Sequence, residues 1–411
     1  MQNRDSLDEW LSWQENLMEE TILLGLERVQ KVYQRLFHNG VPFFVVTVGG
    51  TNGKGSTISF IEGIYKDSKY KIGCSTSPHL IKYNERYAID GKIVDDATIV
   101  RAFEAIEQKR EGVSLTYFEF STLAALLIFA EANIDIAILE VGLGGRLDSV
   151  NVVDCDIAAI TNIDIDHTQY LGNTRESIGF EKAGIMRKNK TCFCADQDPP
   201  KSLLAYADKI GANLTFVREP YNGETGLKGD HQKINAALAV NVVEQLRSQF
   251  PISSEMIEAG VRKAQIAARF EKVKSGNKTV ILDVAHNSAA VKTLIKMLEK
   301  NAMPTVAIFS ALADKDIEDM IKLASKTIKH WFLVPISSER ALQTDDLKNI
   351  FNNSQETTVC NNMKSAINKA LLHNNSSRVV VFGSFYTVTD AMVILKKDKH
   401  YLFTVEHLSD I

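Results

Sequence analysis

The chain has 411 residues, a formal net charge of -4, 45% hydrophobic residues and 24% charged residues. That length is too great for one compact core, so two or three domains are expected. The small negative charge argues against a nucleic-acid binder driven by overall charge, and no apolar run is long enough to span a membrane.

The five cysteines are an odd number at irregular spacing, which does not indicate a disulfide framework. Cys192 and Cys194 could suggest a metal pair, but they alternate on an expected strand and no second pair completes a site. The first residues include acidic side chains and no secretory hydrophobic segment. We therefore expect a cytoplasmic monomer whose partners are small molecules, with no nucleic acid and no membrane.

Residues 1–40 have the apolar spacing of helices. The apolar positions are Trp10, Leu11, Leu17, Leu23, Leu24 and Leu26.

A glycine-rich stretch follows at 45–57, where an apolar β-branched run leads into GTNGKGS at 50–56 and then into helical spacing. Strand, glycine loop and helix in this order make a phosphate cradle, because close backbone N–H groups, the helix N-terminus and Lys54 all attract anions. Ser56 or Thr57 can offer a hydroxyl to a nucleotide-bound Mg²⁺. The match to the common nucleotide loop is imperfect, since Gly55 separates Lys54 from Ser56. The alternative is a glycine-rich turn with one solvated lysine.

The elements after this loop alternate between strands and helices. We expect strands at 71–76, 134–141 and 157–161, a loop with a hairpin at 81–95, and helices at 96–108 and 118–133. Asp95 or Asp96 is expected to cap the first of these helices.

Aliphatic strands that alternate with helices indicate a parallel sheet covered on both faces. Ligands of such sheets bind beyond the carboxyl ends of the strands. The glycine loop, Ser77, Glu140 and the pair Asp166 and His167 all follow strands directly. These residues are therefore expected to converge on one crevice.

A second α/β alternation begins after charged and small residues at 272–278 interrupt the pattern. Its expected strands are 280–284, 306–309, 331–334 and 379–382. The predicted fold is α/β, with a P-loop-containing parallel-sheet ATPase domain at 1–271 and a smaller Rossmann-like domain at 272–411.

Three side chains could carry chemistry, and each has a plain structural alternative. Glu140 ends an aliphatic strand, so it either forms a salt bridge with Arg146 or ligates Mg²⁺. His167 is either a hydrogen-bonded structural residue or a ligand facing the phosphate loop. By spacing alone, Lys182 is an ordinary solvated lysine.

Many segments in order resemble the bacterial bifunctional dihydrofolate synthase/folylpolyglutamate synthases of the Mur ligase superfamily. They are GTNGKGS at 50–56, SPHL at 77–80, NER at 84–86, LTYFE at 115–119, EVGLGGRLD at 140–148, DHT at 166–168, LG at 171–172, EKAGI at 181–185, RFE at 269–271, DVAHN at 283–287 and GSF at 383–385.

The resemblance implies a role for each matched residue. The residues that would bind the nucleotide are Gly53, Lys54, Gly55, Ser56, Asn235, Arg269 and Asp283, and His286 would lie close by. The residues that would bind Mg²⁺ are Ser77, Glu140 and His167. Lys182 would be carbamylated to N6-carboxylysine and would act as a further ligand. The pteroate moiety would meet Thr21, Ile22, Leu23, Leu24, Thr116, Tyr117, Phe118, Glu119 and Asp148.

Some positions depart from the family pattern. Ala268 stands where the family usually has Gly, which would stiffen the hinge. Leu23 stands where relatives can carry an acidic residue. The rings of Tyr117 and Phe118 either pack at the start of a helix or stack on the pterin.

The implied reaction joins L-glutamate to a carboxylate at the expense of ATP. The carboxylate of dihydropteroate, or the γ-carboxylate of a reduced folate, attacks the γ-phosphate, and the glutamate amine displaces phosphate from the acyl phosphate. Lys54, Lys182, His167, Asp283 and His286 are the expected catalytic residues. Closure about a hinge at 269–278 would exclude water.

Two alternatives stay open at this point. A cell-wall Mur ligase would share the loop and mechanism but would need a uridine-diphosphate pocket, usually an extra N-terminal domain. A nucleotide switch would bind partners without ligation and would not need Glu140, His167 and the second α/β domain together.

Overall fold

A computed structural model describes residues 4–18, 22–351, 355–374, 376–397 and 402–403. The chain forms two compact units. The first contains Met1–His79, Tyr83–Gly226 and Gln232–Gln265, and the second contains Leu80–Lys82, Leu227–His231 and Ile266–Ile411. In the described part of the chain, no helix is both long and apolar enough to cross a membrane.

The first unit is built on an eight-stranded sheet in the order β4-β3-β2-β5-β1-β6-β7-β8. From β2 to β8 every pairing is parallel, while β3 and β4 add an antiparallel hairpin at one edge. The strands are β1 Phe44–Gly49, β2 Ile72–Ser75, β3 Tyr87–Ile89, β4 Lys92–Ile93, β5 Ile136–Glu140, β6 Ile157–Ile160, β7 Thr191–Cys194 and β8 Asn213–Phe216.

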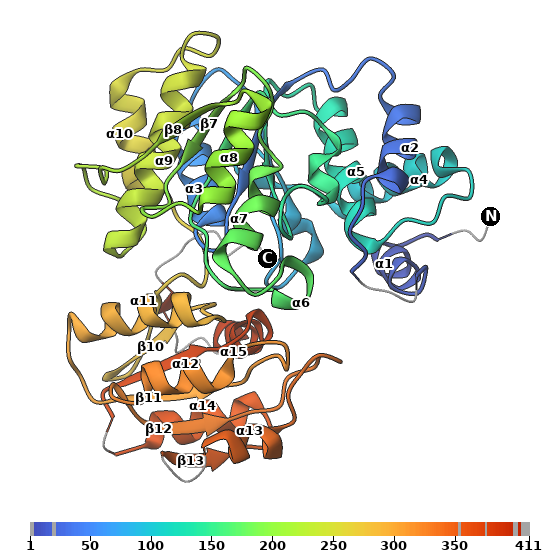
Figure 1. Ribbon diagram of the computed structural model, residues 1–411. Helices are drawn as coiled ribbons and strands as arrows, with labels where there is room; N and C mark the ends of the chain where they lie inside the picture. The colour runs from blue at the N-terminus through green and yellow to red at the C-terminus, as the bar shows by residue number, and fades with distance from the viewer. Residues whose placement is uncertain (1–3, 19–21, 352–354, 375, 398–401, 404–411) are drawn as a thin grey trace. The chain divides into compact units, whose positions relative to one another are not determined.

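Helices cover both faces of this sheet (Figure 1). Successive strand residues point to opposite faces of the sheet. Val45 and Leu139 point to one face, and their neighbours Val46 and Ile138 point to the other. One face carries α1 Leu7–Glu15, α2 Glu27–Leu36, α4 Asp96–Arg110, α5 Tyr117–Glu131, α7 Arg175–Ala183 and α8 Lys201–Ile210. The remaining helical segments are α3 Lys54–Tyr65, α6 Thr168–Leu171, α9 Asp230–Leu246, α10 Ser254–Lys263 and the short 3-10 turns η1 Tyr83–Arg86 and η2 Ser149–Val152.

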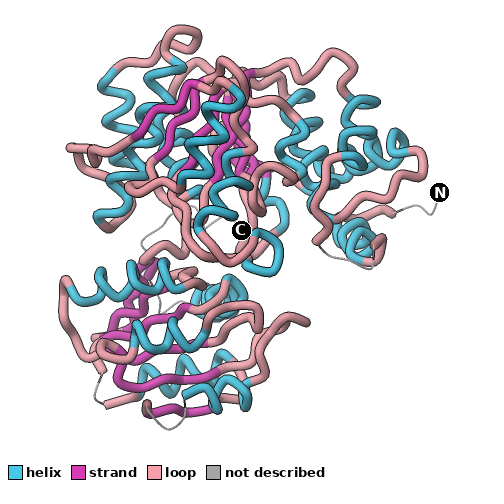
Figure 2. The backbone as a smooth tube through the Cα atoms, in the orientation of Figure 1, coloured by secondary structure: helices cyan, strands magenta, loops and turns pink. Residues whose placement is uncertain are grey.

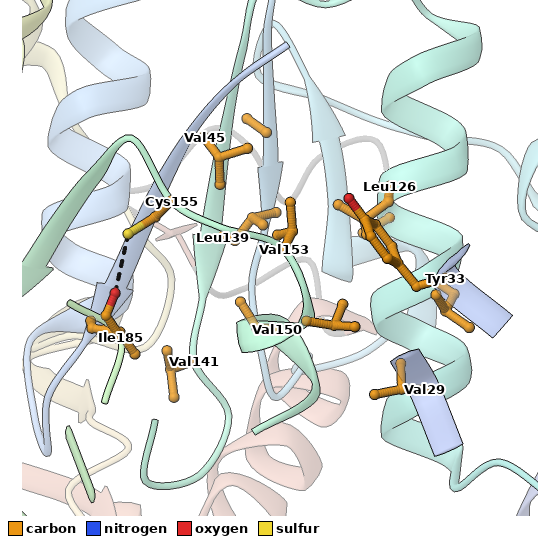
Figure 3. Packing of buried hydrophobic residues seen from close by; sticks show 14 of the residues in the cluster. Val29, Tyr33, Val45, Leu126, Leu139, Val141, Val150, Val153, Cys155 and Ile185 are labelled. Carbon is orange, nitrogen blue, oxygen red and sulfur yellow. Dashed lines mark hydrogen bonds between the residues drawn. The ribbon is translucent and has the colours of Figure 1, made fainter. Parts of the chain in front are cut away.

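The core between the sheet and the first group of helices is continuous (Figure 3). Val45 and Leu139 from the central strands belong to the same core as Leu126 of α5 and Val29 of α2. Cys155 lies at the edge of this core, where its thiol donates to the backbone oxygen of Ile185 at 3.2 Å. Burial of this apolar surface fixes the strand ends that carry the polar loops.

The second unit has a seven-stranded sheet in the order β13-β12-β11-β14-β10-β9-β15. Figure 2 shows strands of this unit in magenta with helices in cyan beside them. The strands from β13 to β10 are parallel, and β9 is antiparallel to its neighbours. The strands are β9 Glu271–Ser275, β10 Lys278–Leu282, β11 Thr305–Phe309, β12 Ile328–Leu333, β13 Glu356–Val359, β14 Arg378–Phe382 and β15 Leu402–Phe403.

Helices also pack on both faces of the second sheet. One face is covered by α11 Ser288–Glu299, α12 Ile317–Ala324 and α13 Thr344–Phe351, and the other by α14 Met363–Leu372 and α15 Phe385–Lys397. The predicted α/β fold with two α/β parts is therefore confirmed.

The structure corrects two details of the sequence-based fold. The helical pattern expected across 1–40 is interrupted, because residues 22–25 form a loop between α1 and α2 that carries Leu23 and Leu24. The charged stretch at 272–278 forms part of an antiparallel hairpin of β9 and β10, in which exposed Lys272 and Lys274 lie on either side of buried Val273. The two compact units divide between Gln265 and Ile266.

Candidate functional site

The loop between β1 and α3 depends on two glycines. Gly50 has φ +135°, and an added Cβ would lie 1.8 Å from Oγ1 of Thr161. Gly53 has φ +94° and caps α3, and its added Cβ would lie 2.6 Å from Oδ1 of Asn235. Only glycine fits both positions, and the second contact places predicted Asn235 against the phosphate loop.

Lys54 begins α3, and its ammonium group turns back onto the loop. Its Nζ donates to the backbone oxygens of Gly50 at 3.1 Å and Thr51 at 3.2 Å. The hydroxyl of Thr57 donates to the Gly53 oxygen at 3.0 Å, so it satisfies the helix backbone. Ser56 is therefore the better of the two candidate hydroxyls for a nucleotide-bound metal.

The segment after β6 holds the phosphate loop in place. The amide of Thr51 donates to the Asn162 oxygen at 2.7 Å, and the amide of Asn52 donates to Oδ1 of Asn162 at 2.8 Å. Oγ1 of Thr51 accepts from the Asp164 amide at 3.0 Å and donates to the Asp164 oxygen at 3.1 Å. The sequence analysis did not assign these residues a role, since contacts between segments this far apart leave no local pattern.

Glu140 lies beside the phosphate loop because β5 pairs with β1 and brings Glu140 opposite Val48. Its Oε2 accepts a hydrogen bond of 3.0 Å from the Ser77 amide, so two of the predicted metal ligands are adjacent. Arg146 forms its ion pair with Glu181 at 2.8 Å, which is not the salt bridge considered from sequence.

The residues here fit a hard divalent cation. The carboxylate of Glu140 is 7% exposed at a strand end, next to a serine that carries a hydroxyl. Within the described ranges, no three His, Cys, Asp or Glu side chains cluster as metal ligands. The predicted set contains only two such residues, Glu140 and His167, so that result is compatible with a site completed by Ser77 and nucleotide oxygens.

Lys182 is 4% exposed near the end of α7. Burial, with a further contribution from the Lys54 charge, lowers the pKa of Lys182 to about 7, while Asp166 and Asp148 act in the opposite direction. This coupling places Lys182, Lys54, Asp148 and Asp166 in one electrostatic neighbourhood. The burial excludes an ordinary solvated lysine, and the lowered pKa favours the neutral amine more than in a solvated lysine.

His167 follows Asp166 at the same end of the sheet. It adopts a left-handed conformation with φ 51° at the N-cap of α6, and its amide donates to Oδ1 of Asp166 at 2.8 Å. The loop after β6 therefore contributes to both the phosphate loop and the surroundings of Lys182.

Asp148 organises the loop that follows β5. Its two carboxylate oxygens accept from the amides of Leu143 at 2.8 Å and Val150 at 2.9 Å. Burial raises the pKa of Asp148 to about 6, although these amides and the Lys54 charge act to lower it. The predicted pteroate contact is thus a buried carboxyl group near the phosphate-loop lysine.

The other predicted pteroate residues meet through Arg28, which the sequence analysis missed. Thr116 and Glu119 form a capping box at the start of α5, and buried Glu119 also pairs with Arg28 at 3.1 Å. Arg28 donates to the Leu23 backbone oxygen at 2.9 Å. The 22–25 loop also contacts the segment before Asp148, since the Gly25 amide donates to the Leu147 oxygen at 3.2 Å.

The structure thus joins three of the predicted pteroate segments, at 22–24, 116–119 and 148. Ile22 and Leu24 are half-buried and Leu23 is exposed, and Thr21 lies outside the described residues. Phe118 packs against Gly142, whose added Cβ would lie 2.6 Å from the ring. Tyr117 packs edge-on against Tyr83, with ring centroids 5.6 Å apart.

The remaining predicted residues form a separate cluster in the second unit. Buried Asp283 follows β10 and accepts from the amides of Phe270 at 2.8 Å and Ala285 at 2.9 Å. Burial raises the pKa of Asp283, while the Arg269 charge opposes this change. The rings of His286 and Phe385 lie 5.7 Å apart, and the Arg269 guanidinium is 6.0 Å from the Phe385 centroid.

A glycine phosphate loop, a carboxylate at the end of the neighbouring strand and a buried lysine on a helix of the same unit, followed by a second α/β unit, define an ATP-dependent ligase of the Mur type. Residues 48–223 match the Mur ligase middle domain, and residues 268–385 match the Mur ligase glutamate ligase domain. Within this superfamily, the chain belongs to the family of bifunctional dihydrofolate synthase/folylpolyglutamate synthases.

The relatives support this placement over nearly the whole chain. The dihydrofolate synthase/folylpolyglutamate synthase of Escherichia coli (strain K12) is 36% identical over 409 residues, which cover 95% of this chain and 95% of that protein. The Bacillus subtilis (strain 168) protein of the same name is 35% identical over 358 residues, 78% of this chain and 82% of that one.

Solved structures agree. E. coli FolC in complex with DHPP and ADP has a TM-score of 0.89 at 34% identity, covering 96% of this chain and 98% of that one. A bifunctional folylpolyglutamate synthase/dihydrofolate synthase with Mn, AMPPNP and L-glutamate bound has a TM-score of 0.87 at 36% identity, covering 95% and 98%.

Proposed function

We propose that this enzyme adds L-glutamate to dihydropteroate, and to the γ-carboxylate of reduced folates, through an acyl phosphate formed with ATP. Family membership over nearly the whole chain supports the activity. Two observations carry the mechanism: the electrostatic coupling of Lys182 to Lys54, Asp148 and Asp166, and the hydrogen bond from the Ser77 amide to Glu140.

The phosphate loop is proposed to bind ATP. The backbone from Gly53 to Ser56 opens α3, so its amides and the helix dipole face the phosphates. In this role Lys54 leaves the carbonyl groups of Gly50 and Thr51 and neutralises charge as the acceptor carboxylate approaches. Asn235 lies against Gly53 and would contact the same nucleotide.

A divalent cation would be held by Ser77, Glu140 and His167. When bound, Mg²⁺ supplies neutralisation of phosphate charge. Lys182 is proposed to carry a carbamate, since a lysine with a pKa of about 7 has a neutral amine that can add CO₂. The resulting anion would suit the cationic surroundings that Lys54 and the metal create.

The second unit is proposed to contact the nucleotide and to position the amine of the incoming glutamate. Arg269 and Asp283 would contact the nucleotide, and Asp283 or His286 would position the glutamate amine or accept its proton. Support comes from their shared cluster at the carboxyl end of β10. The pteroate group would lie among the segments at 22–24, 116–119 and 148 that Arg28 and Leu147 connect.

One assay tests the function against its alternatives. ADP release is measured with dihydropteroate plus glutamate, with tetrahydrofolate plus glutamate, and with UDP-muramyl acceptors. The proposal requires stimulation by the first two mixtures. Stimulation by only the muramyl acceptors would instead identify a cell-wall ligase, and a lack of stimulation by any acceptor would favour a nucleotide switch.

We also propose that the enzyme is a cytoplasmic monomer acting on small molecules, with no nucleic-acid or membrane partner. The five free, buried cysteines and the overall net charge of -4 support this. Gel filtration with light scattering measures the oligomeric state directly.

A further inference from the structure

Arg86 is a buried cation that has no carboxylate partner among the residues that the structure describes. It ends η1 and is 7% exposed. Its Nε donates to Nδ1 of His79 at 3.0 Å. Among the described residues, no carboxylate lies within 4.0 Å of its nitrogens, and its two terminal nitrogens donate no hydrogen bond.

Aromatic rings hold the guanidinium in position. Its central carbon lies 5.2 Å from the centroid of Tyr83 and 5.5 Å from that of Tyr117. Such faces attract a cation, and the unprotonated Nδ1 of His79 provides an acceptor without a negative charge. A buried guanidinium normally has a carboxylate or phosphate partner, because desolvation of its charge is costly. The two terminal nitrogens of Arg86, which we call the fork, are therefore left for an anionic ligand.

The position of Arg86 identifies which anion this is. His79 is two residues after Ser77, which is proposed to hold the metal near which the acceptor carboxylate reacts. Tyr117 lies in the segment proposed to hold the pteroate. The fork is thus placed between the pteroate end of an acceptor and its reacting end.

The two acceptors differ chemically at this point. Dihydropteroate has one carboxylate, and that carboxylate reacts. A reduced folate ends in a glutamyl residue, so it brings an α-carboxylate close to its reacting γ-carboxylate. We propose that Arg86 binds this α-carboxylate and thereby determines how well the enzyme uses glutamylated acceptors relative to dihydropteroate. This inference rests on the proposed function.

The test compares both acceptors in Arg86→Gln and Arg86→Lys. Loss of a bidentate charged contact is expected to raise KM for tetrahydrofolate by about tenfold or more, while KM for dihydropteroate stays within about twofold. Lysine keeps the charge and is expected to recover part of the loss. Equal changes for both acceptors, or no change for either, would overturn the inference.

Arg110→Gln is the matched control. Arg110 is a partly buried arginine that likewise lies next to an aromatic ring, 5.5 Å from the Trp13 centroid, but it has a carboxylate partner in Glu107. Its loss is expected to reduce stability without changing the preference between acceptors. A change in preference of the same size in this variant would also overturn the inference.

Further measurements distinguish binding of the α-carboxylate from binding of other anions and from a folding defect. A raised KM for L-glutamate or ATP with both acceptors would assign the fork to those substrates, against the inference. Equilibrium binding of pteroate and pteroylglutamate, which differ by one glutamyl residue, gives a measurement without turnover. Wild type should favour pteroylglutamate, and Arg86→Lys, the milder variant, should reduce that preference. Absence of ligase activity in the wild type would refute the proposed function instead.

Discussion

The backbone amide of Ser77 donates a 3.0 Å hydrogen bond to Oε2 of Glu140, which joins the end of β5 to the loop after β2. Glu140 is also opposite Val48, directly before the phosphate loop. Glu140 therefore links three strand ends: its carboxylate bonds to the loop after β2, and its backbone lies in the strand that pairs with β1.

Replacement of Glu140 by Gln should remove the charge of this side chain while keeping its size and packing. Glutamine keeps an oxygen that accepts from the Ser77 amide, so the unfolding midpoint should change little. The Mg²⁺ concentration for half-maximal ADP release should rise by about tenfold or more, since a ligand charge is lost. Glu131→Gln, at the exposed end of α5, is the control and should leave that concentration unchanged.

Removal of the Lys182 amine should abolish carbamate formation. We expect Lys182→Ala to lower kcat by about 100-fold or more, if the carbamate holds a metal in the reacting complex. Native mass spectrometry of gently handled wild type should show one added CO₂ that is absent in Lys182→Ala and retained in Lys188→Ala. An unmodified wild-type enzyme with full activity in CO₂-depleted buffer would refute the carbamate.

Replacement of Ala268 by Gly should have an unusually small effect on stability. Ala268 is fully buried with φ 57°, a left-handed conformation that costs a non-glycine residue about 1–2 kcal/mol. Relief of this strain should offset the lost methyl group and the greater freedom of the unfolded chain, leaving a net change below about 1 kcal/mol. Urea unfolding measures it.

Ala366→Gly is the comparison for this prediction. Ala366 is equally buried but lies in α14, where no strain is relieved, so its replacement should cost about 2 kcal/mol. Similar losses in both variants would show that the conformation of Ala268 is not strained.

The cysteines should resist thiol reagents in the folded enzyme. Burial raises the pKa of Cys155 and of Cys194 to about 11, so at pH 8 only about one thiol in a thousand is ionised. Labelling by a disulfide reagent should be slow at pH 8 and should accelerate as the pH rises toward 10. All five cysteines should react after unfolding. Rapid labelling of Cys155 in native protein would contradict its burial.

The sequence predicted the strand ends well, because aliphatic strands followed by polar residues leave a local pattern. Glu140, Ser77 and the glycine loop were predicted as site residues in this way, whereas Lys182 was predicted only through family resemblance. Arg28 and the contact of Thr51 with Asp164 were missed because each joins segments distant in sequence. The capping box of Thr116 and Glu119 has a recognisable spacing and could have been identified beforehand.

The division of the chain has a practical consequence for building hybrids between relatives. Leu80–Lys82 and Leu227–His231 belong to the second unit although most of their neighbours in sequence belong to the first. Thr389 donates to the Leu80 oxygen at 2.8 Å, and Lys300 pairs with Asp230 at 2.7 Å. A chimaera joined at one crossover near residue 265 would therefore combine these short segments with a foreign partner, and a well-folded exchange has to transplant all three pieces together.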